Sequence, residues 1–497
     1  MTGEHLVPLS PGTLAELAGL PVPTYDRTAL RRGIAHFGVG NFHRAHQAVY
    51  IDRYLSQGGS TAWGIVGIGT SDGEAAREKA RRFAEQGCLY TLTELSPSGA
   101  SSTRALGPMV DYLHAPSSPE RVLELLSSPE LHIVTLSITE GGYFMNPETG
   151  EFLADSPEVR DDCSRPVPRT VFGYIVRAME RRRSQGLAPF TVVSCDNLPH
   201  NGEVARAAVT GFARLVSPAL ADWLEEQGAF PSSMVDRVVP YVDDEARAEL
   251  NRRSGVDDKL AVMAESYLQW VLEDRFCDGR PELETVGVQV VGDVSAYETA
   301  KLRLLNAPHV LLSYPGVLAG HRVVNRAVAE PALHGLLEKF MVDDVLPLLE
   351  GSLPEDLVPR EYIASVLERF GNPSVGDQLL RIATDGASKI PTFHTEVVRG
   401  LVGSGGDLRR EALLLACYHR YLGGRDDNGE PFEVTEPSFS AVELDRLRAG
   451  PPAEVLAHPK FAGLRAAGGP AFEQAYRDAA EMLSRSGVLA SVRAVLT

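Results

Sequence analysis

Apolar runs of strand length alternate with helix-like stretches through the first half of the chain, and this alternation limits its possible folds more than any other feature. The predicted helices follow the strands directly, as at residues 41–55, 73–86 and 170–183. Apolar strands that alternate with helices favour a parallel sheet covered on both faces, so we predict a doubly wound α/β domain. The predicted strands are Gly33–Gly40, Trp63–Gly69, Leu131–Ile138, Phe190–Ser194 and Arg237–Val242.

Beyond residues 286–294 the pattern changes to one helix after another. Apolar residues recur three and four positions apart, and glycine or proline separates the segments. We therefore predict two domains, residues 1–290 and residues 291–497, of which the second is mostly helical. Its clearest helical segments are residues 331–350, 356–370, 408–423 and 472–487.

Composition narrows the functional class. With 48 Lys and Arg against 66 Asp and Glu, the chain has a formal net charge of −18, which argues against nucleic acid or an anionic membrane as a partner. No apolar run reaches the roughly 18 residues of a membrane-spanning helix, and no secretion signal is evident. Five widely spaced cysteines without a CxxC pair fit reduced thiols. We expect a cytoplasmic protein that is a monomer or a small homo-oligomer.

A glycine turn follows the first predicted strand and opens a helix. Gly38-Val39-Gly40 would let the backbone turn tightly near a pyrophosphate, and the helix N-terminus would present free N–H groups to it. His43 stands where the third glycine of the usual dinucleotide fingerprint would be, so a plain tight turn is the alternative. The residues predicted to contact a dinucleotide here are Gly38, Gly40, Asn41, Phe42 and, through a phosphate, Arg44.

Two histidines of this segment, His43 and His46, are spaced to share a helix face. They lack the acidic or thiol partner that a metal site would need. We therefore predict that both histidines pack in the interior and that the protein has no metal site.

Asp72 and Glu74 follow the second predicted strand. They are candidates to accept hydrogen bonds from the adenosine ribose, although both lie further from the glycine turn than is usual. Stabilisation of a helix N-terminus is the alternative role. A carboxylate at this position favours NAD over NADP, and no basic cluster follows this strand in the sequence.

Two later strands are also followed by polar side chains. Thr139 and Glu140 follow Leu131–Ile138, and Asn197 follows Phe190–Ser194. Ligands bind beyond the carboxyl ends of strands in such sheets, so these side chains are candidates to face one. The alternative is that they only form turns.

The densest group of chemically capable side chains lies near the start of the helical half. On an α-helix with Lys301 at 0°, Asn306 falls at about 140° and His309 at about 80°, so the three share one broad arc. A neutral lysine can take a hydroxyl proton while an amide holds the developing alkoxide; burial and nearby positive charge must then lower the lysine pKa. Pro308 is predicted to kink this helix. A solvated helix face is the alternative.

Tyr297 and Lys301 also repeat the YxxxK pattern of short-chain dehydrogenases. In those enzymes the pair lies within the dinucleotide domain, whereas here it opens the helical half. We therefore predict a structural role for Tyr297.

Several long motifs, in order along the chain, resemble those of the polyol-specific long-chain dehydrogenases. They are GIAHFGVGNFHRAHQAVYIDRYL, ITEGGYF, VVSCDNLPHNG, MVDRVVP, VLEDRFCDGRPELETVGVQVVGDV and KLRLLNAPH, and the likeness runs from about residue 28 to the C-terminus. The resemblance implies a Rossmann-type N-terminal domain, a mostly α-helical C-terminal domain and a metal-independent reaction.

The resemblance also implies roles for single residues. By motif match, Lys301 would be the general base, Asn197 and Asn306 would form the oxyanion pocket, and His309 would orient the reacting hydroxyl or carbonyl. Glu298 would link the lysine to solvent for proton exchange. The side chains that would bind the remaining substrate hydroxyls are Asp236, Arg381 and Lys389.

The expected activity is a metal-independent, NAD-dependent interconversion of D-mannitol and D-fructose. Fructuronate reduction is an alternative within the family, because Arg381 and Lys389 would serve a carboxylate as readily as a hydroxyl. D-Arabinitol oxidation is another. A dinucleotide-binding regulator without catalysis would not need all four catalytic candidates together. The expected partners are thus NAD and a small polyol or keto-sugar.

Overall fold

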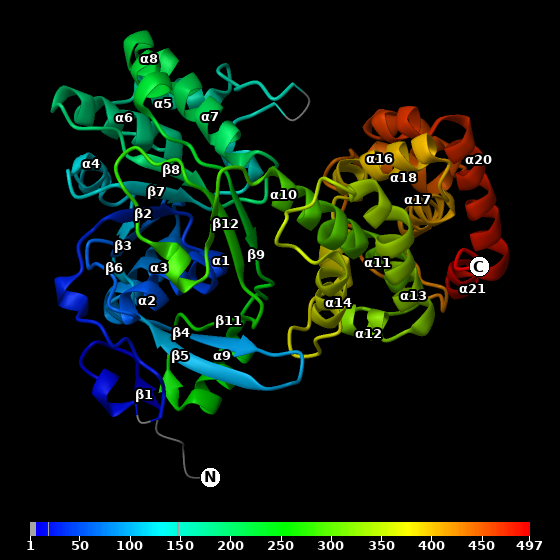
Figure 1. Cartoon of the computed structure of the whole chain (residues 1–497), viewed down its shortest axis with the longest axis horizontal. Coiled ribbons are helices and arrows are strands. Elements are labelled where there is room, and N and C mark those ends of the chain that lie inside the picture. The colour runs from blue at the N-terminus through cyan, green and yellow to red at the C-terminus, as the bar shows by residue number, and fades with distance from the viewer. Residues whose placement is uncertain (1–5, 18, 147–148) are drawn as a thin grey trace. The chain divides into compact units, whose positions relative to one another are not determined.

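The computed structural model of the chain describes residues 6–17, 19–146 and 149–497 and divides into two compact units (Figure 1). The first comprises the residues up to Ser96 together with Ala100–Ser295, and the second comprises Pro97–Gly99 and Ala296–Thr497. The division falls slightly beyond the expected boundary after residue 290.

A five-stranded parallel sheet forms the centre of the first unit (Figure 1). Its spatial order is β6-β3-β2-β7-β8, and all neighbours pair in parallel. The chain thus runs outward from β2 in both directions, which is the strand order of doubly wound dinucleotide-binding sheets. The five strands are β2 (Ile34–Phe37), β3 (Ile65–Gly69), β6 (Met109–His114), β7 (Ile133–Leu136) and β8 (Thr191–Ser194).

Alternate residues of these strands enter two separate apolar cores. Ala35 and Phe37 of β2 pack in the core that helices α4, α6 and α7 cover, whereas Ile34 packs in the core on the other face, against α2. Because both faces are buried, the strands are mostly apolar, which explains why the sequence pattern identified four of these five strands. The helices are α2 (Gln47–Ser56), α4 (Pro119–Ser127), α6 (Val171–Ser184) and α7 (Asn201–Val216).

The predicted strand Arg237–Val242 is wrong. A strand, β9 (Ser233–Asp236), ends just before it. Arg237 turns inward instead and donates to the carbonyl oxygens of Ala45 and Glu265, and Pro240 has no N–H for a strand ladder.

Two three-stranded sheets accompany the parallel sheet, besides a short parallel pair of β1 (Val7–Pro8) with β10 (Val256–Asp257). In one, β12 (Gln269–Glu273) pairs antiparallel with β9 and parallel with β13 (Gln289–Val291). In the other, the hairpin of β4 (Tyr90–Leu95) and β5 (Ser101–Leu106) is extended by β11 (Val262–Glu265), parallel to β4. The sequence analysis predicted neither sheet.

Two predicted helices of the first unit are present with adjusted bounds. The segment 41–55 forms α1 (Asn41–Ala45) and α2, separated at His46, whose φ of −126° and ψ of −88° are not helical. The segment 73–86 forms α3 (Glu74–Glu85).

The second unit is built from helices around one apolar core, as predicted. The segment 331–350 begins as α13 (Pro331–Lys339) and continues as a π-helical and a 3₁₀ turn. Within the described residues, no helix combines the length and apolar character that crossing a bilayer requires. Other helices of this unit are α14 (Pro359–Phe370), α15 (Leu379–Ala383), α16 (Gly386–Ser404), α17 (Arg409–Tyr421) and α20 (Ala462–Ser486).

Candidate active site

The glycine turn lies at the carboxyl end of β2, where the strand order of the sheet reverses. Gly38 has a φ of +89°, and a Cβ there would lie 1.9 Å from the carbonyl oxygen of Ser137. Only glycine fits this position. A Cβ on Gly40, the N-cap of α1, would meet no atom closer than 3.8 Å. The backbone before α1 is therefore open on the side where a dinucleotide pyrophosphate would bind.

Arg44 does not present its charge at this turn, contrary to the expectation that it pairs with a phosphate. Its side chain is buried, donates to the amide oxygen of Asn41 at 2.8 Å and donates to the carbonyl of Leu260. The guanidinium lies over the rings of Phe83 and Tyr90, 5.9 and 5.4 Å from their centroids. Arg44 thus supports the turn from the interior. Leu260, Phe83 and Tyr90 are distant in sequence, so local pattern reasoning had no access to them.

A lysine from α3 reaches the same turn. Lys79 donates a hydrogen bond to the carbonyl of Val39, between the two glycines. Burial, together with the nearby Arg44, lowers the pKa of Lys79 to about 8. By bonding this carbonyl, Lys79 fixes the orientation of the peptide group between Val39 and Gly40.

His43 and His46 pack in the interior, as predicted. His43 stacks on His36 with ring centroids 3.5 Å apart, and His46 Nε2 lies 2.7 Å from the carbonyl oxygen of Gln269. Burial lowers the pKa of His36 to about 3 and that of His43 well below its ordinary value, so both rings are neutral. Within the described residues, no group of three or more His, Cys, Asp and Glu side chains is placed to hold a metal ion.

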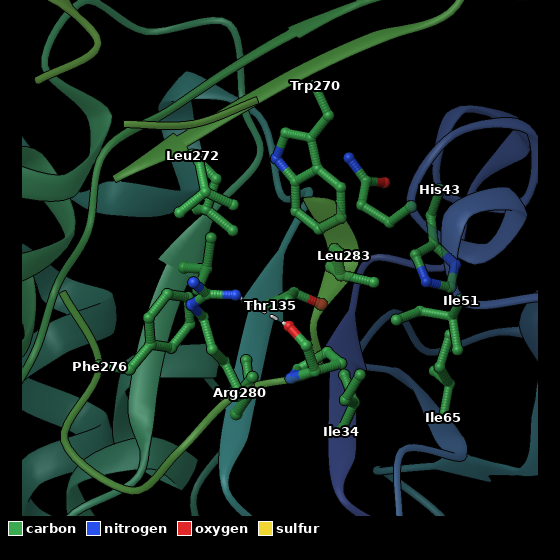
Figure 2. Close-up of a pocket in the computed structure, with 15 residues that line it drawn as sticks. Ile34, His43, Ile51, Ile65, Thr135, Trp270, Leu272, Phe276, Arg280 and Leu283 are labelled. Carbon is green, nitrogen blue, oxygen red and sulfur yellow. Dashed lines mark hydrogen bonds between the residues drawn. The ribbon is translucent and has the colours of Figure 1, made fainter. Parts of the chain in front are cut away.

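A small cavity lies beside His43, between the sheet and α2 (Figure 2). Figure 2 shows Ile34 and Ile65 of the parallel sheet on one side and Trp270 and Leu272 of β12 on another. The cavity volume is about 30 Å³, enough for one or two water molecules. At this volume the cavity is too small for a cofactor or a sugar.

The loops that follow β7 and β8 are joined by Asp196. Its carboxylate accepts hydrogen bonds from the N–H of Ile138 at 3.0 Å, the N–H of Thr139 at 2.9 Å and the hydroxyl of Tyr143 at 2.6 Å. Thr139 has a φ of +63°, which is strained for a β-branched residue. Asp196 compensates this strain and holds Thr139 and the adjoining Glu140 at the carboxyl end of the sheet.

Asn197 follows Asp196 in an exposed loop that Asn201 anchors. The Asn201 amide donates to the carbonyls of Asp196 at 3.0 Å and Ser233 at 2.7 Å, and it accepts from the Ser233 N–H at 2.9 Å. Ser233 begins β9, whose last residue is the buried Asp236. Asn201 therefore joins the loop that carries Asn197 to the strand that ends at Asp236.

Asp72 lines a groove of about 510 Å³ in the first unit. Thr70, which follows β3, and Ala115 and Pro116, which follow β6, contribute to the same groove. The carboxyl ends of these strands are where a doubly wound sheet receives the adenosine of a dinucleotide. The groove volume lies in the range of ligand pockets.

The two acidic candidates differ in their surroundings. Asp72 Oδ1 accepts from the N–H of Gly73 at 2.6 Å and from Arg77 Nη1 at 3.0 Å. Glu74 is the exposed first residue of α3, a position that suits stabilisation of the helix N-terminus. Of the two, only Asp72 lines the groove.

In the second unit, the catalytic candidates Lys301, Asn306 and His309 lie on one helix that contains a π turn. The helix begins as α10 (Ser295–Lys301), passes through the π-helical residues Leu302–Asn306 and continues as α11 (Ala307–Leu318). The N–H of Ala307 bonds to the carbonyl of Leu302, five residues earlier. Glu298 and Lys301 are both buried, at 8% and 9% exposure.

The π turn replaces the kink predicted at Pro308. The wider turn accommodates a residue that has no N–H and whose ring would crowd a regular α-helix. The backbone of the π turn rotates by roughly 80° per residue around the helix axis. Viewed down that axis, Asn306 then lies about 40° from Lys301 in one direction, and His309 lies about 20° from Lys301 in the other. The three positions therefore share an arc of about 60°, narrower than the arc of about 140° predicted for a regular α-helix.

His309 is neutral, and its Nε2 atom has no hydrogen-bond partner within the part of the chain that the structure describes. The ring stacks on Phe370 with centroids 4.5 Å apart, and burial lowers the pKa of His309 to about 4. Its Nε2 lies 3.6 Å from Oδ2 of Asp377. A neutral imidazole with an open nitrogen can bond a substrate hydroxyl or carbonyl.

Arg381 and Lys389 carry their charges near this imidazole, since both contribute to lowering its pKa. Arg381 Nη2 donates to both carboxylate oxygens of Asp377, at 2.7 and 2.8 Å. Lys389 Nζ donates to the carbonyl of Ile382 at 3.0 Å. The sequence analysis missed Asp377, which lies just before α15, four residues ahead of Arg381.

Family models match both units of the chain. A model described as the mannitol dehydrogenase Rossmann domain matches residues 32–285, and one described as the mannitol dehydrogenase C-terminal domain matches residues 293–481. The chain belongs to the mannitol dehydrogenase family. The family resemblance and the fold predicted from the sequence are thereby confirmed.

Relatives of this mannitol dehydrogenase family member differ in their stated substrates and cofactors. A polyol:NADP oxidoreductase of Gluconobacter oxydans is 45% identical, over 90% of this chain and 92% of that protein. A D-sorbitol dehydrogenase of known structure is 43% identical with a TM-score of 0.91, over 97% and 100% of the two chains. The Pseudomonas fluorescens mannitol 2-dehydrogenase, solved as a ternary complex with NAD and D-mannitol, is 36% identical with a TM-score of 0.87, over 99% of each chain.

Several residues that support the site in this mannitol dehydrogenase family member lie outside the sequence-derived set. Asp196 and Asn201 position loops through their side chains, and Lys79 bonds the glycine turn. Asp196 and Asn201 lie within the CDNLPHNG motif, so the motif did carry a signal for them. No sequence signal pointed to Lys79, because its partner Val39 is 40 residues away.

Proposed function

We propose that this protein is an NAD-dependent, metal-independent polyol dehydrogenase that interconverts D-mannitol and D-fructose. The relationship to mannitol 2-dehydrogenase, at 36% identity over nearly the whole chain, supports the substrate class. The glycine turn, with a Gly38 position that admits no Cβ, supports the dinucleotide. Both supports are independent of the catalytic residues.

The arrangement of Lys301, Asn306 and His309 on one helix face carries the proposal of mechanism. Lys301, as the neutral amine, takes the proton of the substrate O2 hydroxyl. Asn306 and Asn197 donate hydrogen bonds to the oxygen as negative charge develops on it, and His309 orients that oxygen through its open Nε2. When bound, the nicotinamide accepts the hydride from C2 of the polyol or returns it to the ketose.

The remaining assigned residues hold the substrate and return the proton. Asp236, Arg381 and Lys389 bind the other hydroxyl groups. Glu298, three residues before Lys301 on α10 and equally buried, passes the proton between Lys301 and solvent.

The pairing of Arg381 favours a neutral sugar over a uronate. Its guanidinium already has a bidentate partner in Asp377, which is 10% exposed at the side chain. A substrate carboxylate would have to compete with this pair, whereas a hydroxyl can bond the existing ion pair without displacing it. Mannitol and fructose are therefore preferred to mannonate and fructuronate.

The decisive experiment measures NADH consumption with D-fructose and with D-fructuronate in parallel, in the presence of a chelator. We expect kcat/KM to be at least about tenfold higher for fructose, as one lost charged hydrogen bond would give. Oxidation of D-mannitol, D-sorbitol and D-arabinitol with NAD serves as the reverse assay. A preference for fructuronate would assign the enzyme to uronate reduction instead.

Replacing either amide of the proposed oxyanion pocket should slow catalysis. We expect Asn306→Ala or Asn197→Ala to lower kcat by about 10²–10³-fold, the usual loss for one oxyanion donor, with little change in NADH affinity. Gln474→Ala is the control, because this exposed amide on α20 bonds to its helix neighbours Asp478 and Arg477. If both asparagine variants lose less than tenfold in kcat, the two amides have structural roles only.

A further inference from the structure

A strap bounded by two arginines borders the groove that Asp72 lines. The strap is Arg165-Pro166-Val167-Pro168-Arg169, and it joins α5 (Pro157–Ser164) to α6 (Figure 1). Both arginines line the groove, together with Val167 and Pro168. All of these groups belong to the first unit.

The strap is firmly anchored at its second end. Asp162, which is 2% exposed, accepts hydrogen bonds from the N–H of Arg169 at 2.6 Å and from the N–H and hydroxyl of Thr170 at 2.9 and 2.5 Å. Gly173 leaves the space that this carboxylate fills, since a Cβ there would lie 2.0 Å from its Oδ2. The two prolines fix φ within the strap. The positions at which its arginines emerge are therefore set by the backbone.

The first end of the strap has its own support. Arg177 of α6 donates to the carbonyl of Arg165 at 3.4 Å, and to that of Cys163 at 3.2 Å. With both ends bonded, the strap loses little further conformational entropy when a ligand binds, which favours recognition.

The arginines make the charge of this groove unlike that of the whole chain. Arg165 and Arg169 line it against one carboxylate, Asp72, which Arg77 already pairs. Outside the lining, Asp161 accepts from Arg165 Nε at 2.7 Å and lies 3.8 Å from Arg169 Nη1. Counted over the lining alone, two guanidinium groups face one carboxylate, and in a chain of net charge −18 this local excess favours an anion. The guanidinium fork matches phosphate oxygens.

We propose that Arg165 and Arg169 recognise a 2′-phosphate on the adenosine ribose, so that the site binds NADP(H) as well as NAD(H). The proposal rests on the proposed function only in taking this groove as the adenosine end of the cofactor site. The 2′-phosphate accepts hydrogen bonds from the strap, while Arg77 offsets the repulsion from Asp72. The strap carries both arginines, and it lies far beyond β3 in the sequence. The residues directly after β3 therefore indicated a preference for NAD over NADP.

The test compares two fragments of the cofactors by isothermal titration calorimetry, without substrate or turnover. The probes are 5′-AMP and adenosine 2′,5′-bisphosphate, at low ionic strength because salt screens exposed charges. The variants are Arg165→Gln/Arg169→Gln and, as a matched control, Arg160→Gln. Arg160 is an exposed arginine of α5 that pairs with Asp155 at 2.5 Å and does not line the groove.

We expect the native protein to bind the bisphosphate at least about tenfold more tightly than 5′-AMP, as one or more charged hydrogen bonds would give. The double variant should lose that preference and keep its 5′-AMP affinity within about threefold, and Arg160→Gln should change neither affinity. Arg169→Lys should give an intermediate preference, because the ammonium keeps the charge but not the fork.

Three outcomes would overturn the proposal: no preference in the native protein, a preference that survives in the double variant, or an equal loss of both ligands. An equal loss would mean that the strap only forms a wall for the adenine. An enzyme that is inactive on polyols but shows the expected preference would overturn the proposed function and leave the role of the strap intact.

Discussion

Lys301→Ala is expected to abolish polyol oxidation, with kcat falling by about 10⁴-fold, the upper end for a lost general base. The methyl group of alanine cannot take the hydroxyl proton, and His309, whose pKa is lowered to about 4, is too weak a base to replace the lysine. NADH affinity should stay within about threefold. The measurements are NADH formation with saturating D-mannitol and a fluorescence titration with NADH.

A matched control and a rescue experiment make the test of Lys301 specific. Lys339→Ala removes a half-exposed lysine of α13 that lies 3.7 Å from Asp343, and it should leave kcat unchanged. Added small primary amines should restore part of the activity of Lys301→Ala, because they can enter the vacated space and accept the proton. Turnover of Lys301→Ala within tenfold of the native rate would refute the assignment of Lys301 as the base.

Gly38→Ala is expected to have the second largest effect, a loss of NADH affinity of at least about 100-fold together with reduced thermal stability. At a φ of +89°, any side chain is strained, and its Cβ would lie 1.9 Å from the Ser137 carbonyl oxygen, so the turn must move. Strain of this kind costs on the order of 3 kcal/mol or more. Calorimetric melting and NADH titration would measure the two losses.

Gly40→Ala in the same turn separates folding from cofactor binding. Its φ of −102° is accessible to alanine, and the nearest atom to the added Cβ is 3.8 Å away. This variant should melt close to the native protein, yet it should weaken NADH binding, because the Cβ narrows the approach of a pyrophosphate. A Gly38→Ala variant that binds NADH like the native protein would show that the turn has no part in cofactor binding.

The sequence predicted those elements whose burial imposes a regular pattern. β2, β3, β7 and β8 are buried on both faces and mostly apolar, and α14 and α17 repeat apolar residues at helical spacing, so their positions followed from local pattern alone. β11, in contrast, is stabilised by pairing with β4, which lies far earlier in the chain. Alternative pairings of that kind cannot be ranked from one sequence.

The candidate site was predictable to a similar degree. Its glycine turn and its helix with Lys301 were identified because each is a contiguous motif. The burial of Arg44 could not be predicted from the sequence, because it depends on the ring of Tyr90 and the carbonyl of Leu260, which lie far from Arg44 along the chain. The π turn was only partly predictable, because Pro308 marked a break in the helix but not its form. It follows from hydrogen bonding that Pro308 makes possible by lacking an N–H.

The π turn between Lys301 and His309 adds a residue to this helix without turning its two halves apart. A π turn is equivalent to one residue inserted into an α-helix. The five residues Leu302–Asn306 rotate by about 400° in the π turn, which is the rotation that four residues make in an α-helix. Deleting one of Leu302–Leu305 would therefore restore a regular helix and leave α11 in nearly the same orientation relative to α10, whereas inserting a residue between Asn306 and His309 would rotate His309 by about 100°. This helix should thus tolerate a change of length inside the π turn better than one after it, and the two variants would separate the role of the turn itself from that of the alignment it preserves.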